Sequence, residues 1–157
     1  MLGIVLAAST ASAAVPGGGT AAHAPVPASA ATIRVCEAGG HHYCIGAPHL
    51  ALGKPVVESV GGRNLDIIVF GSYVEIRFDA NRRLCVAAAN NGFLAVIHAC
   101  NGGSGAKWKI IPTSDGHDAF RNVQFSTKYL SGRNRNGSQY HVKNCCATGW
   151  GYKFNVL

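Results

Sequence analysis

The sequence is poor in charge, in aromatic side chains and in long apolar runs. Charged residues make up 13% of the 157 residues and aromatic residues 8%, whereas hydrophobic residues reach 48% and there are 20 glycines. This composition excludes a disordered chain and a charged helical bundle. No capped segment has helical periodicity over about ten residues, so short apolar runs separated by glycines predict β structure with many turns.

Residues 1–31 differ in kind from the rest of the sequence. An apolar run at residues 1–8 precedes an Ala11-x-Ala13 pattern that signal peptidase accepts, and a second such pattern ends at Ala30 beyond an Ala/Pro/Gly-rich stretch. The run is shorter than the about 20 residues that span a bilayer, so we expect no stable membrane insertion. No Lys or Arg precedes the run, and a disordered tail on a cytosolic protein is the alternative. We interpret residues 1–31 as a signal peptide with a disordered segment, and the protein as secreted and extracellular.

Acidic residues are scarce, and none follows Asp118. All 14 Lys and Arg and all seven Asp and Glu lie within residues 33–157, so this part carries a charge of +7. A basic face attracts anionic polysaccharides, nucleic acid or anionic lipid, but higher solubility explains the charge equally well. Aromatic residues interleaved with the charges are few, and export argues against nucleic acid as a partner.

Motifs for catalysis are absent as well. The sequence has no Gly-x-Ser-x-Gly, no His-Glu-x-x-His and no phosphate-binding glycine loop. No spacing pairs the seven carboxylates as a glycosidase requires, and we expect most of them to be solvated surface charges beside Arg or at turns. We therefore predict a non-enzyme without a cofactor.

Three similar segments indicate an internal repeat. Their apolar starts are Tyr43, Leu84 and Tyr129, which lie 41 and 45 residues apart, and each segment ends in an apolar strand. Four short strands in each of three units make twelve, as in a β-trefoil, where a six-stranded barrel is closed by three hairpins. We predict an all-β fold: a single β-trefoil of three four-stranded repeats over residues 32–157, with repeats at about 32–71, 72–117 and 118–157.

The expected strands follow from alternation of apolar and polar residues. Each unit opens with one, at residues 32–36, 73–78 and 120–125, and has another in its middle, at residues 56–58, 94–98 and 139–143. In the third opening strand we expect Phe120, Val123 and Phe125 to contact the core. Apolar residues at the ends of the units would fill the barrel: Ile67, Val69, Trp108, Ile110, Phe154 and Val156.

The second repeat resembles the ricin-type β-trefoil lectin family. It carries Leu84-Cys85-Val86, then Cys100-Asn101-Gly102 and Lys107-Trp108, where family repeats have a Cys-Leu/Val-Asp start, a Cys-Asn-Gly segment and a Gln-x-Trp ending. The resemblance implies a carbohydrate-binding module, although it is specific only across residues 82–111. It also implies a disulfide between Cys85 and Cys100.

The polar residues of a family sugar site are largely replaced. Where the family has an Asp that holds two sugar hydroxyls, this sequence has Gly46, Ala87 and Gly132. The family's aromatic platform falls on Val57, His98 and Lys143, and an Asn before the Gln-x-Trp ending survives only as Asn64. The resemblance therefore implies a lectin-like scaffold with degenerate sugar sites.

The other cysteines admit several pairings. Cys36 and Cys44 flank a turn and bridge it, or one of them reaches the last repeat, where Cys145 and Cys146 are adjacent. Cys36, His41, His42 and Cys44 offer a metal-ligand set, but their spacing matches no common zinc pattern. We favour disulfides, which suit a small exported domain, and predict no metal.

The residues that we assign to ligand binding are polar and lie at or near the family positions or in the basic loop of the third repeat: Asn64, His98, Asn101, Asn134, Arg135, Asn136, Gln139 and Lys143. Their amide and guanidinium groups hydrogen-bond hydroxyls or sulfates, whereas the alternative interpretation of the loop is a plain turn. The favoured partner is carbohydrate, including anionic polysaccharide, bound by a monomer. The alternative function is a protein-interaction module, such as a protease inhibitor on a trefoil scaffold.

Overall fold

The computed structural model describes residues 33–39, 41–101, 103–144 and 150–157. Within them the chain forms antiparallel strands and two 3-10 turns, η1 (Ser104–Ala106) and η2 (Trp150–Tyr152), and no α-helix. The strands are β1 (Val35–Glu37), β2 (Cys44–Gly46), β3 (Val57–Ser59), β4 (Leu65–Phe70), β5 (Tyr73–Phe78), β6 (Asn81–Ala88), β7 (Ala95–Ala99), β8 (Trp108–Pro112), β9 (Asp118–Asn122), β10 (Lys128–Ser131), β11 (His141–Asn144) and β12 (Phe154–Val156). The expected leader at residues 1–31 and the cysteines at 145 and 146 lie outside the described residues.

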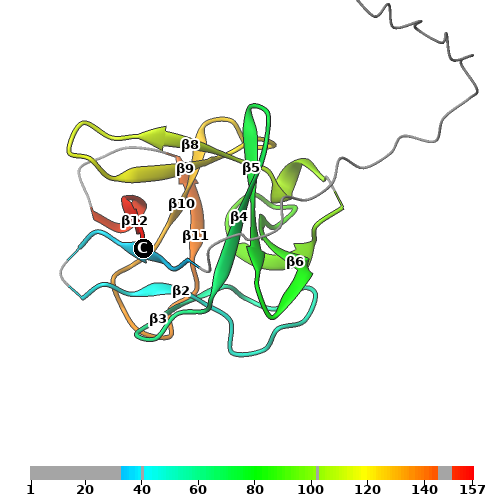
Figure 1. The fold of residues 1–157 in the computed structure, drawn as a ribbon, viewed down its shortest axis with the longest axis horizontal. Coiled ribbons are helices and arrows are strands. Elements are labelled where there is room, and N and C mark those ends of the chain that lie inside the picture. Colours follow the sequence, from blue (N-terminus) through cyan, green and yellow to red (C-terminus); the bar gives the residue numbers. More distant parts are fainter. Residues whose placement is uncertain (1–32, 40, 102, 145–149) are drawn as a thin grey trace, which may run out of the picture.

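The strand pairing follows the same pattern three times. β2 pairs with β3, β6 with β7, and β10 with β11, while β4 pairs with β5, β8 with β9, and β12 with β1. β5–β8 and β9–β12 pairs connect these units. Ile33 and Leu65 exchange two backbone hydrogen bonds of 3.0 and 2.9 Å, which join the start of the described chain to β4. Figure 1 shows the β2–β3 hairpin and the β8–β9 hairpin at opposite ends of the view.

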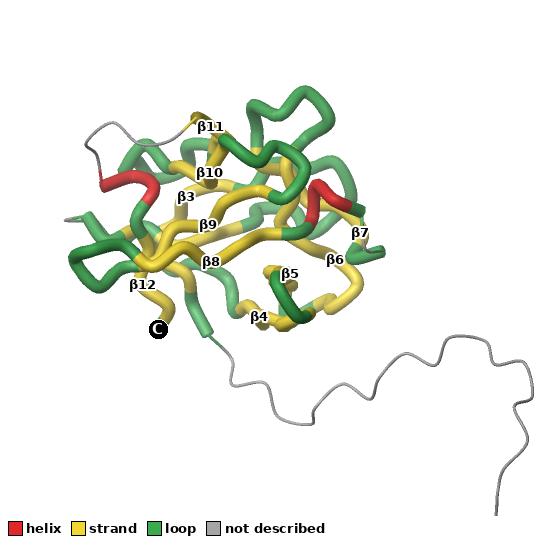
Figure 2. Tube along the Cα trace, turned by 90° about the horizontal axis from the view of Figure 1, so that it is seen from above, coloured by secondary structure: helices red, strands yellow, loops and turns green. Residues whose placement is uncertain are grey.

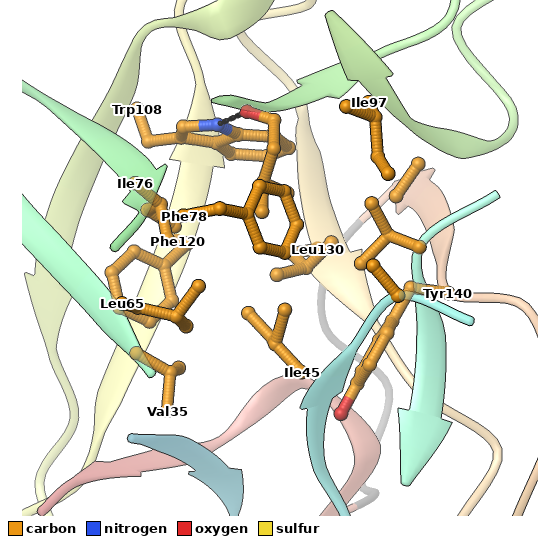
Figure 3. Packing of buried hydrophobic residues seen from close by; sticks show 14 of the residues in the cluster. Val35, Ile45, Leu65, Ile76, Phe78, Ile97, Trp108, Phe120, Leu130 and Tyr140 are labelled. Carbon is orange, nitrogen blue, oxygen red and sulfur yellow. Dashed lines mark hydrogen bonds between the residues drawn. The ribbon is translucent and has the colours of Figure 1, made fainter. Parts of the chain in front are cut away.

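The strands enclose one main apolar core. Its largest fully buried side chains come from all three units and include Trp108, Tyr140, Phe78, Phe120 and Phe154. Figure 3 shows Phe78, Leu130 and Ile45 pointing toward one another in the middle of this cluster. Seen from above, the strands gather in the centre and the loops lie around them (Figure 2). Aromatic and branched side chains of this kind supply the main driving force for folding.

Three side chains that the sequence analysis placed in the core are not buried there. Val69 is 68% exposed and Val156 is 39% exposed, because each lies near the end of its strand, beyond the packed interior. Val123 is only partly buried, since β9 ends at Asn122 and the chain turns there. Trp108 and Phe154 are fully buried as expected. The middle strands of the units begin one or two residues later than the alternation predicted, whereas β5 has the expected bounds.

The expectation that the carboxylates are solvated is also wrong for four of them. Glu37, Glu58 and Asp66 have no exposed surface, and Glu75 is 2% exposed. Arg82 pairs with Asp66 at 2.7 Å, and Arg77 pairs with Glu75 at the same distance. Buried charges persist where such partners or backbone N–H groups compensate their lost hydration. Glu58 has backbone partners of this kind, described below.

Candidate ligand-binding pockets

Two disulfides stabilise the loops near the candidate sites. Cys85–Cys100 forms as the resemblance implied and joins β6 to the residue after β7. Cys36 pairs with Cys44, so the alternative in which either reaches the last repeat is wrong. Because both sulfurs are bridged, the metal-ligand set with His41 and His42 is not available either. In the described part of the chain the only group of three potential metal ligands is Glu75 with Cys85 and Cys100, whose sulfurs also form a disulfide.

A small pocket lies between the second repeat and Gln124 of the third, and we call it the His98 pocket. Its volume is about 180 Å³. Ala87 and Ala88 at the end of β6 form part of its lining, and His98 comes from β7, directly across the ladder from Cys85. The remaining lining residues are Asn90, the segment from Gly103 to Ala106, and Gln124. None of the described residues that line this pocket carries a charged side chain.

Asn122 positions two walls of the His98 pocket. Its side chain is buried, and its amide nitrogen donates to the Gly105 carbonyl at 2.9 Å. Its amide oxygen accepts from the backbone N–H groups of Gln124 at 3.0 Å and Phe125 at 3.1 Å. One side chain thus holds η1 and the segment after β9 together, in the manner of an Asx turn. Neither Asn122 nor Gln124 was predicted, because both come from the next unit of the chain.

The polar groups at the rim of the His98 pocket are neutral and accessible. Asn90, His98, Ser104 and Gln124 are all exposed, and the Ser104 hydroxyl lies 3.4 Å from the Gln124 amide oxygen. Such side chains offer both donors and acceptors to a ligand's hydroxyl groups. The Nδ1 atom of His98 lies 3.2 Å from the Ala99 carbonyl, which leaves its Nε2 atom available.

A second pocket lies between the first repeat and the loop of the third, and we call it the Asn136 pocket. It measures about 330 Å³, and its lining includes Gly46, Ser59 and Arg63 from the first repeat and Asn136 and Gly137 from the third. Its one cationic lining residue is partly engaged, because the Arg63 guanidinium donates twice to the Ala47 carbonyl, at 3.1 and 2.9 Å. The described residues give this pocket apolar walls and few polar groups that are free to bind a ligand.

The predicted binding residues are not brought together in one site. His98 and Asn136 line the two pockets above, and Asn64 lines a third cavity of about 230 Å³ next to Phe78. Two of them have structural contacts: Asn101 accepts from the Gly103 N–H at 3.4 Å, and Gln139 donates to the Ala95 carbonyl at 3.0 Å. The others are exposed: Asn134 and Arg135 on the loop, and Lys143 on β11.

The three positions where the family has an Asp differ in their surroundings. Gly46 lines the Asn136 pocket and Ala87 lines the His98 pocket, so each lies at a cavity. Gly132 is different, because a Cβ atom there would collide with the carboxyl group of Glu37. The equivalent position of the third repeat is therefore filled by a side chain from β1 and offers no cavity.

No family model matches the sequence, and no curated protein matches it either. Solved structures share the fold. A mosquitocidal holotoxin matches with a TM-score of 0.72 and 15% identity over 80% of this chain and 17% of its own. A designed three-fold symmetric protein, ThreeFoil, matches with a TM-score of 0.66 and 14% identity over 80% and 97%. A Polyporus squamosus lectin, solved with a human-type influenza-binding epitope, matches with a TM-score of 0.64 and 11% identity over 80% and 48%.

These likenesses support the β-trefoil fold expected from the sequence, and they show a scaffold of the kind that lectins and toxins use. The chain spans only 17% of the holotoxin and about half of the lectin, but nearly all of the designed protein. In the described part of the chain, no helix has the length and apolarity needed to cross a membrane.

Proposed function

We propose that this protein is a secreted, non-catalytic carbohydrate-binding module, and that the His98 pocket holds one neutral sugar unit. The scaffold in this proposal is a β-trefoil over residues 32–157, in which β1, β4, β5, β8, β9 and β12 form a closed barrel. The protein acts as a monomer, and the two disulfides are consistent with an extracellular location.

The observation that carries this proposal is the lining of the His98 pocket. Four neutral polar side chains line the pocket together with the buried Ala87 and Ala88. Sugars are bound by amide and hydroxyl groups that reach their hydroxyls and by an apolar wall that covers their C–H groups. The volume of about 180 Å³ suits one sugar ring rather than a longer segment of glycan. The lectin among the structural neighbours supports the same class of ligand.

The basic third repeat supports a second way of binding carbohydrate. Arg133 and Arg135 are exposed on the loop and Lys143 is exposed on β11, with no acidic residue after Asp118 in the sequence. Such a surface attracts sulfated or other anionic polysaccharides through charge, and this attraction weakens as salt rises. Salt dependence therefore distinguishes a surface polyanion from a neutral sugar in the pocket.

The test is a glycan array probed with the oxidised protein at low and at physiological salt, including sulfated and wall polysaccharides. We expect salt-independent binding to a neutral glycan that is lost in a His98→Ala/Gln124→Ala double variant. Both side chains are exposed, so the variant should keep its stability. Asn136→Ala is the matched control, because it alters only the other pocket.

Other outcomes have definite meanings. Binding that is lost at physiological salt and in an Asn134→Ala/Arg135→Ala variant would place the ligand on the basic loop. No binding at either salt would reject the carbohydrate proposal and favour the alternative, a protein-interaction module such as a protease inhibitor, which a stoichiometric complex with a protease would support.

A further inference from the structure

Two buried carboxyl groups lie beside the loop of the third repeat. Glu37 is the last residue of β1 and Glu58 lies in β3, and neither has any exposed surface. β2 pairs with both strands, which places the two residues in one small sheet. Two carboxyl groups in one buried site rarely both ionise, because neither charge is well hydrated there.

Glu58 holds residues 132–138, which we call the latch loop. Its two carboxyl oxygens accept the backbone N–H groups of Arg133 and Arg135. Its own backbone N–H donates to the Ser138 carbonyl, and its carbonyl accepts from the Gly137 N–H, both at 2.8 Å. Four hydrogen bonds from one residue therefore hold the loop against the first repeat. Bonds from N–H groups to a carboxylate are strongest when it is ionised, so this geometry suits a charged Glu58.

Glu37 has weaker partners. Its two carboxyl oxygens receive no hydrogen bond of standard geometry from the described residues, and the polar groups that act on them are the Glu58 carboxyl group, the Tyr140 hydroxyl and the backbone N–H of Asn134. Gly132, the first residue of the latch loop, packs directly against this carboxyl group, and the Tyr140 ring lies close to Gly132. Burial, and then the negative charge of Glu58, raise the pKa of Glu37 to about 8. The geometry and the charges thus agree that Glu37 is the protonated member of the pair.

No cation in the described surroundings replaces that proton. The side chains of Arg133 and Arg135 are exposed on the loop, and the Lys153 ammonium next to β12 pairs with Asp115. His141 has its pKa lowered by burial and by the positive charges of Arg133 and Lys143, which favours its neutral form. Burial and the two carboxylates raise the pKa of the Tyr140 hydroxyl, so this group stays neutral as well.

A metal ion fits this pair less well than a proton. Both oxygens of Glu58 already accept backbone N–H groups, whose positive ends disfavour a nearby cation. Hard cations such as Ca²⁺ take about six to eight oxygen ligands, and the described residues gather no third acidic or imidazole ligand here.

We propose that Glu37 and Glu58 hold one proton between them, and that this proton keeps the latch loop closed on the first repeat at neutral pH and releases it in alkali. When the proton leaves Glu37 for solvent, two negative charges face each other in a dry site. Moving the loop outward admits water to both carboxylates and breaks the bonds to Arg133 and Arg135. Because Asn136 and Gly137 form one wall of the Asn136 pocket, that pocket opens with the loop.

The test is residue-resolved amide hydrogen exchange of the oxidised full chain without any ligand, so its result is independent of the carbohydrate proposal. After correction for the intrinsic pH dependence of exchange, we expect protection at Arg133 and Arg135 to fall about tenfold between about pH 6 and about pH 7 and to level off above about pH 8. In Glu37→Gln, which is neutral and of the same size, protection should persist. Core amides of Ile110 and Phe120 report whether the whole domain has opened.

Two results would overturn the proposal: protection at Arg133 and Arg135 that does not change up to about pH 9, or an equal loss in Glu37→Gln. If that variant does not fold, the carboxyl carbon signal of Glu37 in the natural protein decides. A midpoint near 8 supports the shared proton, whereas a midpoint near the ordinary value of 4.5 rejects it.

Discussion

The indole N–H of Trp108 donates to the backbone carbonyl of Val86 at 2.8 Å and so ties β8 to β6 inside the core. Trp108 is completely buried and is the largest of the core side chains. Figure 3 shows this bond at the upper edge of the hydrophobic cluster. A polar atom of a buried Trp normally finds such a partner, because an unpaired donor in an apolar interior is unfavourable.

Replacing Trp108 by Phe should therefore destabilise the protein in two ways. The Val86 carbonyl loses its partner, which costs about 1–3 kcal/mol, and the smaller ring leaves space unfilled. We expect the free energy of unfolding to fall by about 2–4 kcal/mol in denaturant titrations. Phe120→Leu, which removes volume but no hydrogen bond, is the control and should lose less. An equal loss in both variants would show that the hydrogen bond contributes little.

The strands were predictable where one segment carries its own pattern. Residues 73–78 alternate regularly, and β5 has the bounds that this alternation indicates. The same local reasoning was wrong for Val69, because alternation tells which face a side chain is on but not how far the strand extends past the core. Burial at strand ends depends on neighbours that are distant in sequence.

The buried carboxyl groups show more clearly that local sequence does not predict contacts with distant residues. Glu58 binds backbone N–H groups that lie 75 and 77 residues further along the chain, and no local sequence pattern around Glu58 predicts these contacts. The pocket was partly predictable: His98 followed from the family resemblance, whereas Gln124 joins it only because Asn122 turns the chain there. Sites built between repeats require knowledge of how the repeats are packed.

Asn122→Ala should damage the His98 pocket without touching its rim. The substitution leaves the Gly105 carbonyl and the N–H groups of Gln124 and Phe125 without their partner. We expect a loss of about 1–3 kcal/mol in the free energy of unfolding, because the side chain is buried. Any glycan binding should weaken as well. Ser104→Ala, at the exposed rim, is the comparison for binding and should leave stability unchanged. Unchanged stability in Asn122→Ala would argue that solvent replaces these contacts.

The two disulfides should differ in their effect on stability. Cys85 and Cys100 are 15 residues apart, and Cys36 and Cys44 are eight apart. By the chain-entropy estimate, removing the disulfide that closes the longer loop lowers the free energy of unfolding by about 3 kcal/mol, and removing the one that closes the shorter loop lowers it by about 2.5 kcal/mol. Paired Cys→Ala variants, unfolded in denaturant without reductant, give the two values. A larger loss for Cys36/Cys44 would show that native-state contacts, rather than loop entropy, dominate.

The raised pKa of Glu37 predicts that stability falls with rising pH. In the unfolded chain this carboxyl ionises near its ordinary value of 4.5, whereas in the folded protein its pKa is about 8. Between these values only the folded state retains the proton, so each unit of rising pH lowers the free energy of unfolding by up to about 1.4 kcal/mol. Above about pH 8 both states are ionised and the dependence on Glu37 ends.

Denaturant titrations between about pH 7 and about pH 8 measure this slope most cleanly. The lowered pKa of His141 acts in the opposite direction, but only at acidic pH, where the unfolded chain takes up the proton more readily. In Glu37→Gln the free energy of unfolding should not change over this pH interval, and at the upper end of the interval it should exceed that of the natural protein. If the stability of the natural protein were as independent of pH as that of the variant, Glu37 would be ionised in the folded state.

Gly132→Ala tests how closely the latch loop packs on Glu37. A Cβ atom at this position would meet the Glu37 carboxyl group and would come within 3.0 Å of the Tyr140 ring, so the loop has to move outward. That movement strains the bonds from Glu58 to Arg133 and Arg135, and we expect a loss of about 1–3 kcal/mol of stability together with faster amide exchange at both residues. Gly61→Ala is the matched control, since a Cβ atom there meets nothing within 4 Å. It should be neutral, or stabilise slightly by restricting the unfolded chain. Equal behaviour of the two variants would mean that the latch loop does not pack on Glu37 in solution. The protonation of Glu37 and Glu58 could then not control the position of the loop.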